Sequence, residues 1–577
     1  MKTKRIIGKT LDLFRLRYPM YYNVSLLRNN WGWEYFPNFG EKDARFLLYQ
    51  IVQNSKSFLK EVEKIPKDGP VILFPHMRGG NYLLNFETFL AKRLQLEGAK
   101  PIFMACENLP QCNNRSIDLP INPNICKKCL KTNKYYSKLM RLPLYSLTDF
   151  VNIESYHEVY KVINSLSIRD CINYKYKNVP VGKLCEVSIS RYLCRDAFTD
   201  NSDEGLKAWR DYICGAIVLV DVYKKAFRKL KPEIIFLCSG RFFWYGIAHW
   251  MAQKQKIRVV SYESAFNNSK RGSQWTFREE IPVSEMDLGS YWKNWRNTTL
   301  NRYENNQLDQ EMAKHHHDPI IYPNPIEDQD ILLKNLDLIN NNKPIVAMFP
   351  NLTWDSAVSG RRTIFKSVLE WINETIKFAE RNDSFNLVIR VHPAEMLIFE
   401  GNHSREYVID YLQDKFGNLP DNVKLIPPDS QLSSYTLLNL AKSVLVYTGT
   451  LGLESSILGK HSVIICGRAH YANKGFGYFP QSREDYFKLL SELDKLSLPT
   501  KEEIALARRY AYMFWFRTVI PLQFFETSKD YCIKHYTLKT LADLKPGNNP
   551  YLDLVVDGIL KGKDIVLPRD ILKNDNQ

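Results

Sequence analysis

Short runs of apolar, mostly β-branched residues recur along the chain, separated by stretches with apolar residues at three- and four-residue spacing. In the second half the runs are Ile345–Phe349, Leu387–Val391, Val423–Ile426, Val444–Val446 and Val463–Cys466. In the first half they are Val71–Phe74, Ile102–Ala105, Ile234–Leu237 and Ile257–Val260. Because strands that alternate with helices form parallel sheets with crossover helices, the pattern predicts an α/β protein.

The chain has 577 residues, which is too long for one hydrophobic core and predicts more than one domain. We expect two Rossmann-like domains facing each other across a cleft, an N-terminal one over 1–315 and a C-terminal one over 344–499. The polar stretch 316–343 is expected to be a linker and 500–577 a helical tail. The strand pattern weakens over about 106–204, which predicts a cysteine-containing insertion in the first domain.

Polar residues gather where the strands of the second half end, at the edge where open α/β sheets bind ligands. Arg390, His392 and Glu395 follow one of these strands. A cation and an imidazole suit the phosphate groups of a nucleotide or pyrophosphate. The alternative interpretation is a core histidine with a structural ion pair.

Two neighbouring loops supply further candidates at this edge. Asn351 and Asp355 follow the first strand of the second half, and they are predicted to contact the ligand, unless Asp355 only caps a helix. Thr448 and Thr450 stand in a glycine-containing turn that opens a helix after the fourth strand. Such a turn suits phosphate or ribose oxygens.

Three more residues belong to the predicted ligand site. Ser433 and Ser434 precede another predicted helix, in a position to cap it or to touch ligand. Glu454, one turn into the helix after Thr450, is predicted to bind ribose hydroxyls, with a capping role as the alternative. Tyr471 follows the last strand and is predicted to pack against the base or the sugar.

This ordered set of motifs resembles the capsular polysaccharide biosynthesis family, whose members are glycosyltransferases of the two-Rossmann (GT-B) type and include capsule Kdo transferases. The resemblance implies a C-terminal domain that binds a nucleotide-activated sugar and an N-terminal domain that binds the acceptor. In related families the His-Pro pair contacts the nucleotide phosphate, which implies this role for His392. The resemblance also implies that no catalytic metal is needed.

The first half resembles the same proteins more loosely, at Ser239–Gly240–Arg241 and at Tyr262–Glu263. Similar proteins have asparagine where Ser239 stands. Glu263, at a strand end, is a candidate general base for the acceptor hydroxyl, and His76, in a loop after another strand, is its rival. The alternative for Glu263 is a structural ion pair with a nearby arginine.

Cysteines and histidines cluster at two places. Cys106, Cys112, Cys126 and Cys129 fit a structural zinc site with four thiolate ligands, with an iron–sulfur cluster or unconnected reduced thiols as alternatives. The consecutive histidines His315–His317 are interpreted as part of a solvated polar tract rather than as metal ligands.

The formal net charge of +16 indicates an anionic partner. Candidates are a nucleotide sugar, an anionic glycan or lipid-linked acceptor, and the inner membrane surface; no nucleic-acid motif is visible, so nucleic acid is not expected. The basic N-terminus has no signal-peptide pattern and is either a membrane-surface segment or an ordinary first helix. A cytoplasmic protein, peripheral on the inner face of the cell membrane, is expected.

The motifs predict an enzyme that moves a sugar from a nucleotide-activated donor to a growing capsular or lipopolysaccharide-type glycan. Two alternatives stay open. One is a polyol-phosphate transferase of the teichoic-acid type, which uses a similar His-Pro pair. The other is a non-catalytic polysaccharide assembly or export factor.

Overall fold

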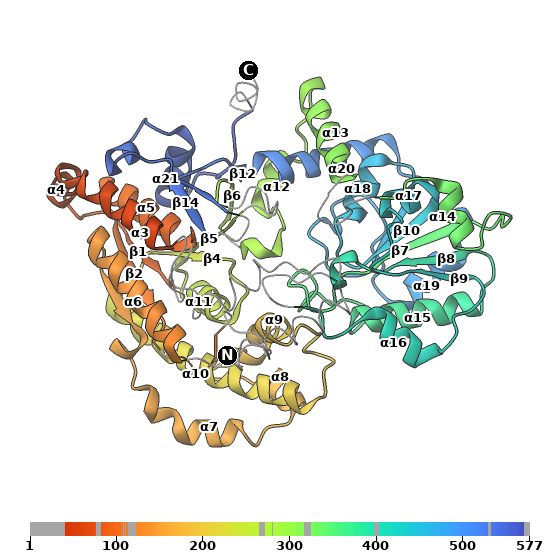
Figure 1. Ribbon diagram of the computed structural model, residues 1–577, viewed down its shortest axis with the longest axis horizontal. Coiled ribbons are helices and arrows are strands. Elements are labelled where there is room, and N and C mark those ends of the chain that lie inside the picture. Colours follow the sequence, from red (N-terminus) through yellow and green to blue (C-terminus); the bar gives the residue numbers. More distant parts are fainter. Residues whose placement is uncertain are drawn as a thin grey trace, which may run out of the picture. The chain divides into compact units, whose positions relative to one another are not determined.

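The computed structural model describes residues 41–76, 82–107, 109, 111–112, 123–264, 272–279, 281–316, 325–396, 403–528 and 532–569. These residues form two compact units (Figure 1). The first α/β unit comprises the described parts of Trp31–Tyr192, Asn201–Trp295 and Met513–Gln577. The second α/β unit comprises Leu193–Asp200 and the described part of Arg296–Tyr512.

A parallel sheet forms the core of the second unit. Its strands are β7 (Ile345–Phe349), β8 (Asn386–Arg390), β9 (Val423–Ile426), β10 (Ala441–Val446) and β11 (Ser462–Ile465). They lie in the order β11-β10-β7-β8-β9, and every neighbouring pair is parallel. The chain builds outward from β7 on one side and then returns to the other, so the reversal point of a Rossmann-like sheet lies between β7 and β10.

Helices cover both faces of this sheet. They are α13 (Arg302–His316), α14 (Gln329–Asn335), α15 (Val368–Glu380), α16 (Val408–Phe416), α17 (Ser434–Leu440), α18 (Leu451–Leu458), α19 (Arg483–Ser491) and α20 (Lys501–Tyr512). In Figure 1, α15 and α16 lie on one side of the strands, and α17 and α18 on the other. The predicted apolar stripe of α15, including Ile372 and Ile376, is buried in the core, and each such side chain contributes about 1.5–3 kcal/mol.

The loop after β7 is longer than expected. The sequence suggested that a helix begins close to Asp355, but α15 begins at Val368, where the Ser367 hydroxyl accepts a hydrogen bond from Glu370 N. Residues 350–367 therefore form a folded loop at the carboxyl end of the sheet.

The first unit contains a larger, mixed sheet. Its strands are β1 (Val71–Phe74), β2 (Lys100–Ala105), β3 (Leu144–Ser146), β4 (Ile234–Cys238), β5 (Arg258–Ser264), β6 (Trp275–Arg278) and β12 (Val519–Ile520), in the order β12-β6-β5-β4-β1-β2-β3. β1 to β5 are parallel, whereas β6 is antiparallel to β5 and to β12. The parallel part has the same connectivity as the second sheet, and its reversal point lies between β1 and β4.

The helices of the first unit connect these strands. They are α3 (Glu41–Gln53), α4 (Lys56–Lys64), α5 (Tyr82–Leu96), α6 (Pro123–Met140), α7 (His157–Ile163), α8 (Ile168–Asn173), α9 (Val181–Leu193), α10 (Asp203–Leu230), α11 (Phe243–Lys254), α12 (Ser290–Trp295) and α21 (Pro550–Lys561). The apolar face of α10, which includes Trp209, Ile213 and Ile217, is buried. Together the two units confirm the expected fold class, an α/β protein with two Rossmann-like sheets.

Some segments differ from the organisation that the sequence suggested. The stretch 106–204, expected to be an insertion, supplies α6 and β3, so its first part is a regular helix–strand crossover of the sheet. The stretch 500–577, expected to be a helical tail, contains α20 and α21 but also β12 and the hairpin of β13 (Phe525–Thr527) and β14 (Ile533–Tyr536). The proposed linker 316–343 contains α14.

These differences have a simple cause. β3 and β12 consist of three and two residues, which is too short to give a visible period in the sequence. The N-terminal segment expected to lie on a membrane surface is outside the described ranges, and so is His317. In the part of the chain that the structure describes, no helix has the length and apolarity to cross a membrane.

Candidate functional site

A hydrogen bond stabilises the turn at the reversal point between β7 and β10. Asn351, directly after the start of the loop that follows β7, accepts a hydrogen bond from Thr448 N through Oδ1 at 3.0 Å. This bond joins the two loops across the crevice where open α/β sheets bind ligands. The Thr448 side chain is 4% exposed, and its hydroxyl has no hydrogen-bond partner among the described residues. A buried hydroxyl of this kind is available to a ligand oxygen.

The turn leads into α18 with open backbone donors. Thr450, the residue before the helix, has helical backbone angles and makes no side-chain cap. It is exposed. Helix N-termini without a cap favour anionic ligands, because their first N–H groups point outward and the helix dipole adds partial positive charge.

Tyr471 packs against this turn and stabilises it. Its ring is fully buried, and its hydroxyl donates a hydrogen bond to Gly449 O. It packs tightly against Gly452, where an added Cβ would collide with the tyrosine oxygen and lie 2.7 Å from Val446 Cγ2. Tyr471 therefore presents no face for stacking on a base, and its position suits holding the turn rather than touching a sugar.

His392 lies after β8 and is half-buried. Its Nδ1 accepts a hydrogen bond from Ala394 N at 3.1 Å, so the neutral ring carries its proton on Nε2. Burial lowers the pKa of His392 to about 4, opposed by the Asp355 carboxylate and assisted by Arg390. At neutral pH the side chain is therefore an uncharged Nε2–H donor.

Asp355 is engaged in its own loop. Its Oδ1 accepts a hydrogen bond from Ala357 N at 2.9 Å, and its carbonyl accepts one from Val358 N. It thus caps a turn of the 350–367 loop, and its negative charge faces His392.

Arg390 and Glu395 are bound to the backbone around them. The Arg390 guanidinium donates to Pro427 O and, at 3.1 Å, to Ser430 O, and the side chain is 1% exposed. Glu395 accepts from Val408 N at 3.3 Å, at the start of α16. Burial raises the pKa of Glu395 to about 8. Both residues therefore hold the loops in place rather than facing a ligand.

Glu454 belongs to a cluster that joins three helices. Its carboxylate accepts a hydrogen bond from Tyr435 Oη at 2.9 Å, and its other oxygen lies 3.4 Å from His315 Nδ1. His315 Nε2 lies 3.7 Å from Glu311 Oε1. Burial alone would lower the pKa of His315, but bonding to Glu311 and Glu454 raises it to about 10. This imidazolium fixes the orientation of Glu454 in the first turn of α18.

Sequence reasoning did not find this cluster. His315 was interpreted as part of a solvated tract, yet it is the penultimate residue of α13 and contacts α18. The signal was present in the helical spacing of Leu308 and Met312, which are buried and mark the inner face of α13. Ser434 is the first, buried residue of α17, which Ser433 caps by accepting from Tyr435 N.

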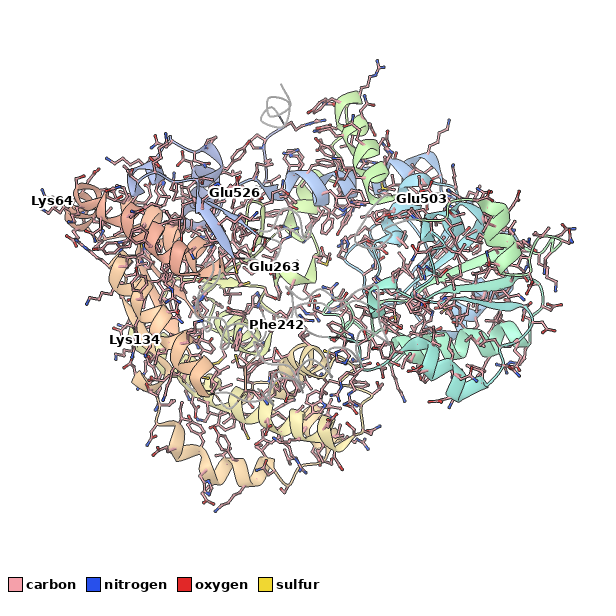
Figure 2. The ribbon with its side chains drawn as sticks, viewed as in Figure 1. Lys64, Lys134, Phe242, Glu263, Glu503 and Glu526 are labelled. Carbon is pink, nitrogen blue, oxygen red and sulfur yellow. The ribbon has the colours of Figure 1, made fainter. Side chains whose placement is uncertain are left out.

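In the first unit, the two general-base candidates lie near the reversal point. Glu263 is half-buried at the end of β5 (Figure 2), with Cys238 Sγ at 3.8 Å from its Oε1. His76 follows β1 and is 1% exposed, with Nδ1 against the carboxylate of Glu87. Arg241, one arginine considered as a partner for Glu263, lies 3.1 Å from Glu285.

The neighbouring loop after β4 has a left-handed backbone at Ser239. Ser239 has a φ of 62°, a left-handed conformation that asparagine adopts more readily than serine. Gly240, with φ of 87°, completes this tight turn after β4. An asparagine at this position in similar proteins therefore has a backbone reason.

The four cysteines of the predicted metal site are partly buried and reduced. Burial raises the pKa of the Cys106 thiol, with smaller contributions from Cys112, Cys129 and Cys126. Among the described residues, no group of three or more His, Cys, Asp or Glu side chains is arranged to hold a metal ion.

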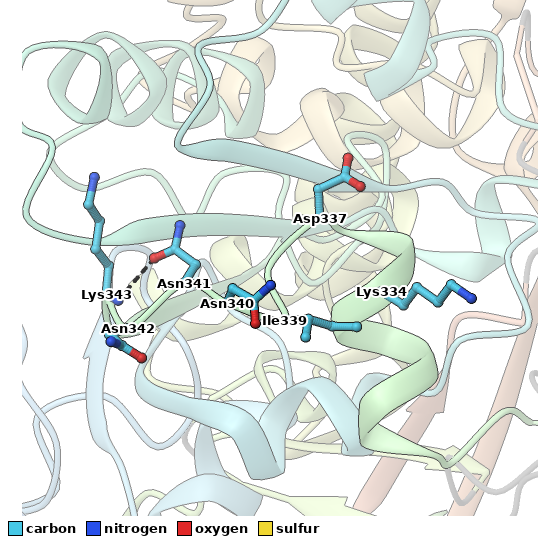
Figure 3. A pocket seen from close by; sticks show the side chains of 7 residues that line it. All are labelled: Lys334, Asp337, Ile339, Asn340, Asn341, Asn342 and Lys343. Carbon is cyan, nitrogen blue, oxygen red and sulfur yellow. Dashed lines mark hydrogen bonds between the residues drawn. The ribbon is translucent and has the colours of Figure 1, made fainter.

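One hollow lies away from the sites above. It has a volume of about 840 Å³ and is open and polar (Figure 3). Its lining residues are Lys334, Asp337, Ile339, Asn340, Asn341, Asn342 and Lys343. These precede β7, so the hollow lies at the amino end of the strand, opposite to the edge where Asn351 and Thr448 meet.

No family model and no curated protein sequence matches the chain. The chain is similar in structure to the UDP-GlcNAc 2-epimerase of Neisseria meningitidis bound to UDP-GlcNAc, with 12% identity, 76% of this chain and 95% of that chain covered, and a TM-score of 0.26. It is also similar to KpsC of Thermosulfurimonas dismutans, a β-Kdo 2,7 transferase, with 13% identity, 50% and 79% covered, and a TM-score of 0.26.

A third similar structure is a glycosyltransferase of Rickettsia africae, with 11% identity, 86% of this chain and all (100%) of that chain covered, and a TM-score of 0.23. The assignment of two Rossmann-like sheets rests on the strand order of the chain itself.

Proposed function

We propose that this chain is a nucleotide-sugar-dependent glycosyltransferase whose donor site is the carboxyl edge of the second sheet. One observation carries the proposal. At the reversal point, the bond from Thr448 N to Asn351 holds a turn whose own hydroxyl is buried without a partner, directly before the uncapped start of α18. This is the arrangement that phosphate groups bind.

Each donor residue has a distinct role in this proposal. The N–H groups at the start of α18 and the Thr448 hydroxyl bind donor phosphate oxygens. His392 donates its Nε2–H to the leaving phosphate, because its Nδ1 is already occupied by Ala394 N. Glu454, oriented by Tyr435 and His315, binds ribose hydroxyls.

The acceptor is proposed to be a growing surface glycan of the capsular or lipopolysaccharide type, deprotonated by Glu263 or His76. An anionic acceptor suits a row of exposed lysines on one face of α6. These are Lys127, Lys131, Lys134 and Lys138, of which Lys134 is labelled in Figure 2. Their spacing of three and four residues lines them up along the helix. Salt should weaken this contact.

A structural zinc ion held by Cys106, Cys112, Cys126 and Cys129 remains a proposal. Cys112, Cys129 and Cys126 add to the rise in the pKa of the Cys106 thiol that burial causes, and the spacing of the four cysteines in the sequence supports the proposal. When bound, zinc would crosslink the segment between β2 and α6. Elemental analysis of the purified chain tests this: zinc near one atom per chain, lost in Cys126→Ser, is expected, and a metal-free chain with normal stability contradicts it.

The proposed transferase is tested by incubating the chain with sugars linked to CMP, CDP, UDP, GDP and dTDP. Release of free nucleotide from one donor, together with transfer of a phosphorus-free sugar to a glycan acceptor, is the expected result. A product that gains phosphorus indicates the polyol-phosphate transferase. Nucleotide binding with no release from any donor, with and without a glycan acceptor, indicates the non-catalytic assembly factor.

A further inference from the structure

Three side chains from separate elements of the first unit form a buried relay. His76 lies two residues after β1, Glu87 on α5 and Tyr262 on β5. Tyr262 Oη donates to Glu87 Oε1 at 2.6 Å, and the other carboxylate oxygen of Glu87 lies against His76 Nδ1. All three side chains are almost fully buried.

The buried surroundings of Tyr262 make its hydroxyl the donor in the bond to Glu87. Its ring stacks on Phe236 at a centroid distance of 4.8 Å and also contacts Phe86 at 5.2 Å. Burial, followed by the charge of Glu87, raises the pKa of Tyr262 well above its ordinary value. The tyrosine therefore keeps its proton and is a donor to Glu87, and the second carboxylate oxygen faces His76 Nδ1.

This arrangement selects one tautomer of His76. A proton on Nδ1, which faces the carboxylate, leaves a lone pair on Nε2. Among the described residues neither buried ring nitrogen has a hydrogen-bond partner, but Nδ1 lies against the Glu87 carboxylate. A histidine whose near nitrogen faces a carboxylate and whose far nitrogen keeps its lone pair has the form of a general base.

We propose that His76 is the general base of the glycosyl transfer and that Glu87 is its positioning residue, with Tyr262 holding Glu87. The inference rests on the proposed function and assigns the base that the sequence left open. His76 Nε2 takes the proton of the acceptor hydroxyl while that oxygen bonds to the anomeric carbon. The bond from this carbon to the donor phosphate breaks, and the nucleotide leaves with the electron pair. Glu87 stabilises the imidazolium that forms.

Glu263 is less suited to this task. Successive side chains on a strand point to opposite faces, so Glu263 leaves β5 on the side away from Tyr262 and the carboxylate of Glu87. Glu263→Gln is therefore the variant that tests the rival base, and the expected loss of kcat is smaller for it than for His76→Gln.

The test measures release of free nucleotide from the donor that reacts among the five nucleotide sugars, with water or glycan as acceptor. His76→Gln and Glu87→Gln are each expected to lower kcat by about 10²–10⁴-fold. Donor KM and stabilisation by the free nucleotide should stay at the wild-type level. Tyr262→Phe should lower kcat less than these two variants do, and Glu87→Asp should be faster than Glu87→Gln. The double variant His76→Gln/Glu87→Gln should be no slower than His76→Gln alone.

Two results would overturn the proposal. One is turnover within about threefold of wild type in Glu87→Gln, and the other is a loss confined to Glu263→Gln. A variant that unfolds is recognised because nucleotide no longer raises its unfolding temperature. In that case the kcat values of Glu87→Asp and Tyr262→Phe test the proposal.

A second measurement does not depend on transferase activity. Diethyl pyrocarbonate reacts with a neutral imidazole nitrogen, and peptide mass spectrometry reports the extent at His76. His535, whose side chain is 53% exposed, is the internal reference. His76 is expected to react, and several-fold more slowly in Glu87→Gln. No reaction at His76 while His535 is fully modified would show that the ring is not reachable, and would contradict its role as a base. If no donor reacts at all, the proposed function fails while this result still tests the relay.

Discussion

At the scale of single residues, several predicted ligand contacts have partners within the protein. Arg390 donates to backbone carbonyls, Glu395 caps α16, and Tyr471 supports the turn before α18. The residue types and their place at strand ends could be predicted from the sequence. Their partners could not, because these are backbone groups of other loops and elements, such as Pro427 O and Ser430 O after β9 and Val408 N at the start of α16, which only the folded chain brings close.

His315 gives a residue-scale prediction about stability. Its pKa is raised from 6.5 to about 10 in the folded protein, so its contribution is fully present below pH 6.5 and is lost as the pH rises through about 10. His315→Gln should lower the free energy of unfolding by about 1–2 kcal/mol at pH 6 and have a much smaller effect near pH 10.5. Urea unfolding of both proteins across this range measures it.

The pH dependence separates this ion pair from packing. If His315→Gln lowers the free energy of unfolding equally at pH 6 and near pH 10.5, His315 contributes only packing to the cluster with Glu311 and Glu454. His535→Gln, at an exposed position, is the control and should change stability by no more than about 0.5 kcal/mol.

At the scale of elements, the turn that opens α18 depends on glycine for two different reasons. Gly452 has no room for a side chain, because Tyr471 Oη and Val446 lie against it. At Gly449 the nearest atoms to an added Cβ are those of Asn351, at 3.9 and 4.0 Å, an ordinary contact distance. The sequence shows both glycines alike, whereas the packing distinguishes them.

Gly449→Ala and Gly452→Ala are therefore a matched pair. Gly452→Ala should lower the free energy of unfolding by about 1–3 kcal/mol through overpacking. Gly449→Ala should leave it within about 0.5 kcal/mol but weaken nucleotide binding several-fold, because the methyl group enters the space where phosphate approaches the turn. Thermal unfolding with and without nucleotide measures both effects. Unchanged nucleotide affinity in Gly449→Ala would show that the phosphate does not bind at this turn.

At the scale of the whole molecule, two sheets with the same parallel strand order occur in one chain. The long apolar runs, such as Ile345–Phe349, predicted parallel strands, since a buried parallel strand is apolar throughout, but the order of the strands follows from the folded structure. Two strands at one side of the first sheet, β12 and β6, escaped prediction. β12 consists of only two residues, and β6 reads Trp-Thr-Phe-Arg, a pattern that becomes a strand only by pairing with β5.

The central claim is that a nucleotide binds at the carboxyl edge of the second sheet with His392 as a donor. The most direct measurement is thermal unfolding of the full chain with CMP, CDP, UDP, GDP and dTDP, comparing wild type with His392→Ala and the control His535→Ala. One nucleotide should stabilise wild type and the control, by about 2.7 kcal/mol at a concentration of 100 times Kd, and should stabilise His392→Ala far less. No stabilisation by any of the five, or equal stabilisation of His392→Ala, would contradict the claim.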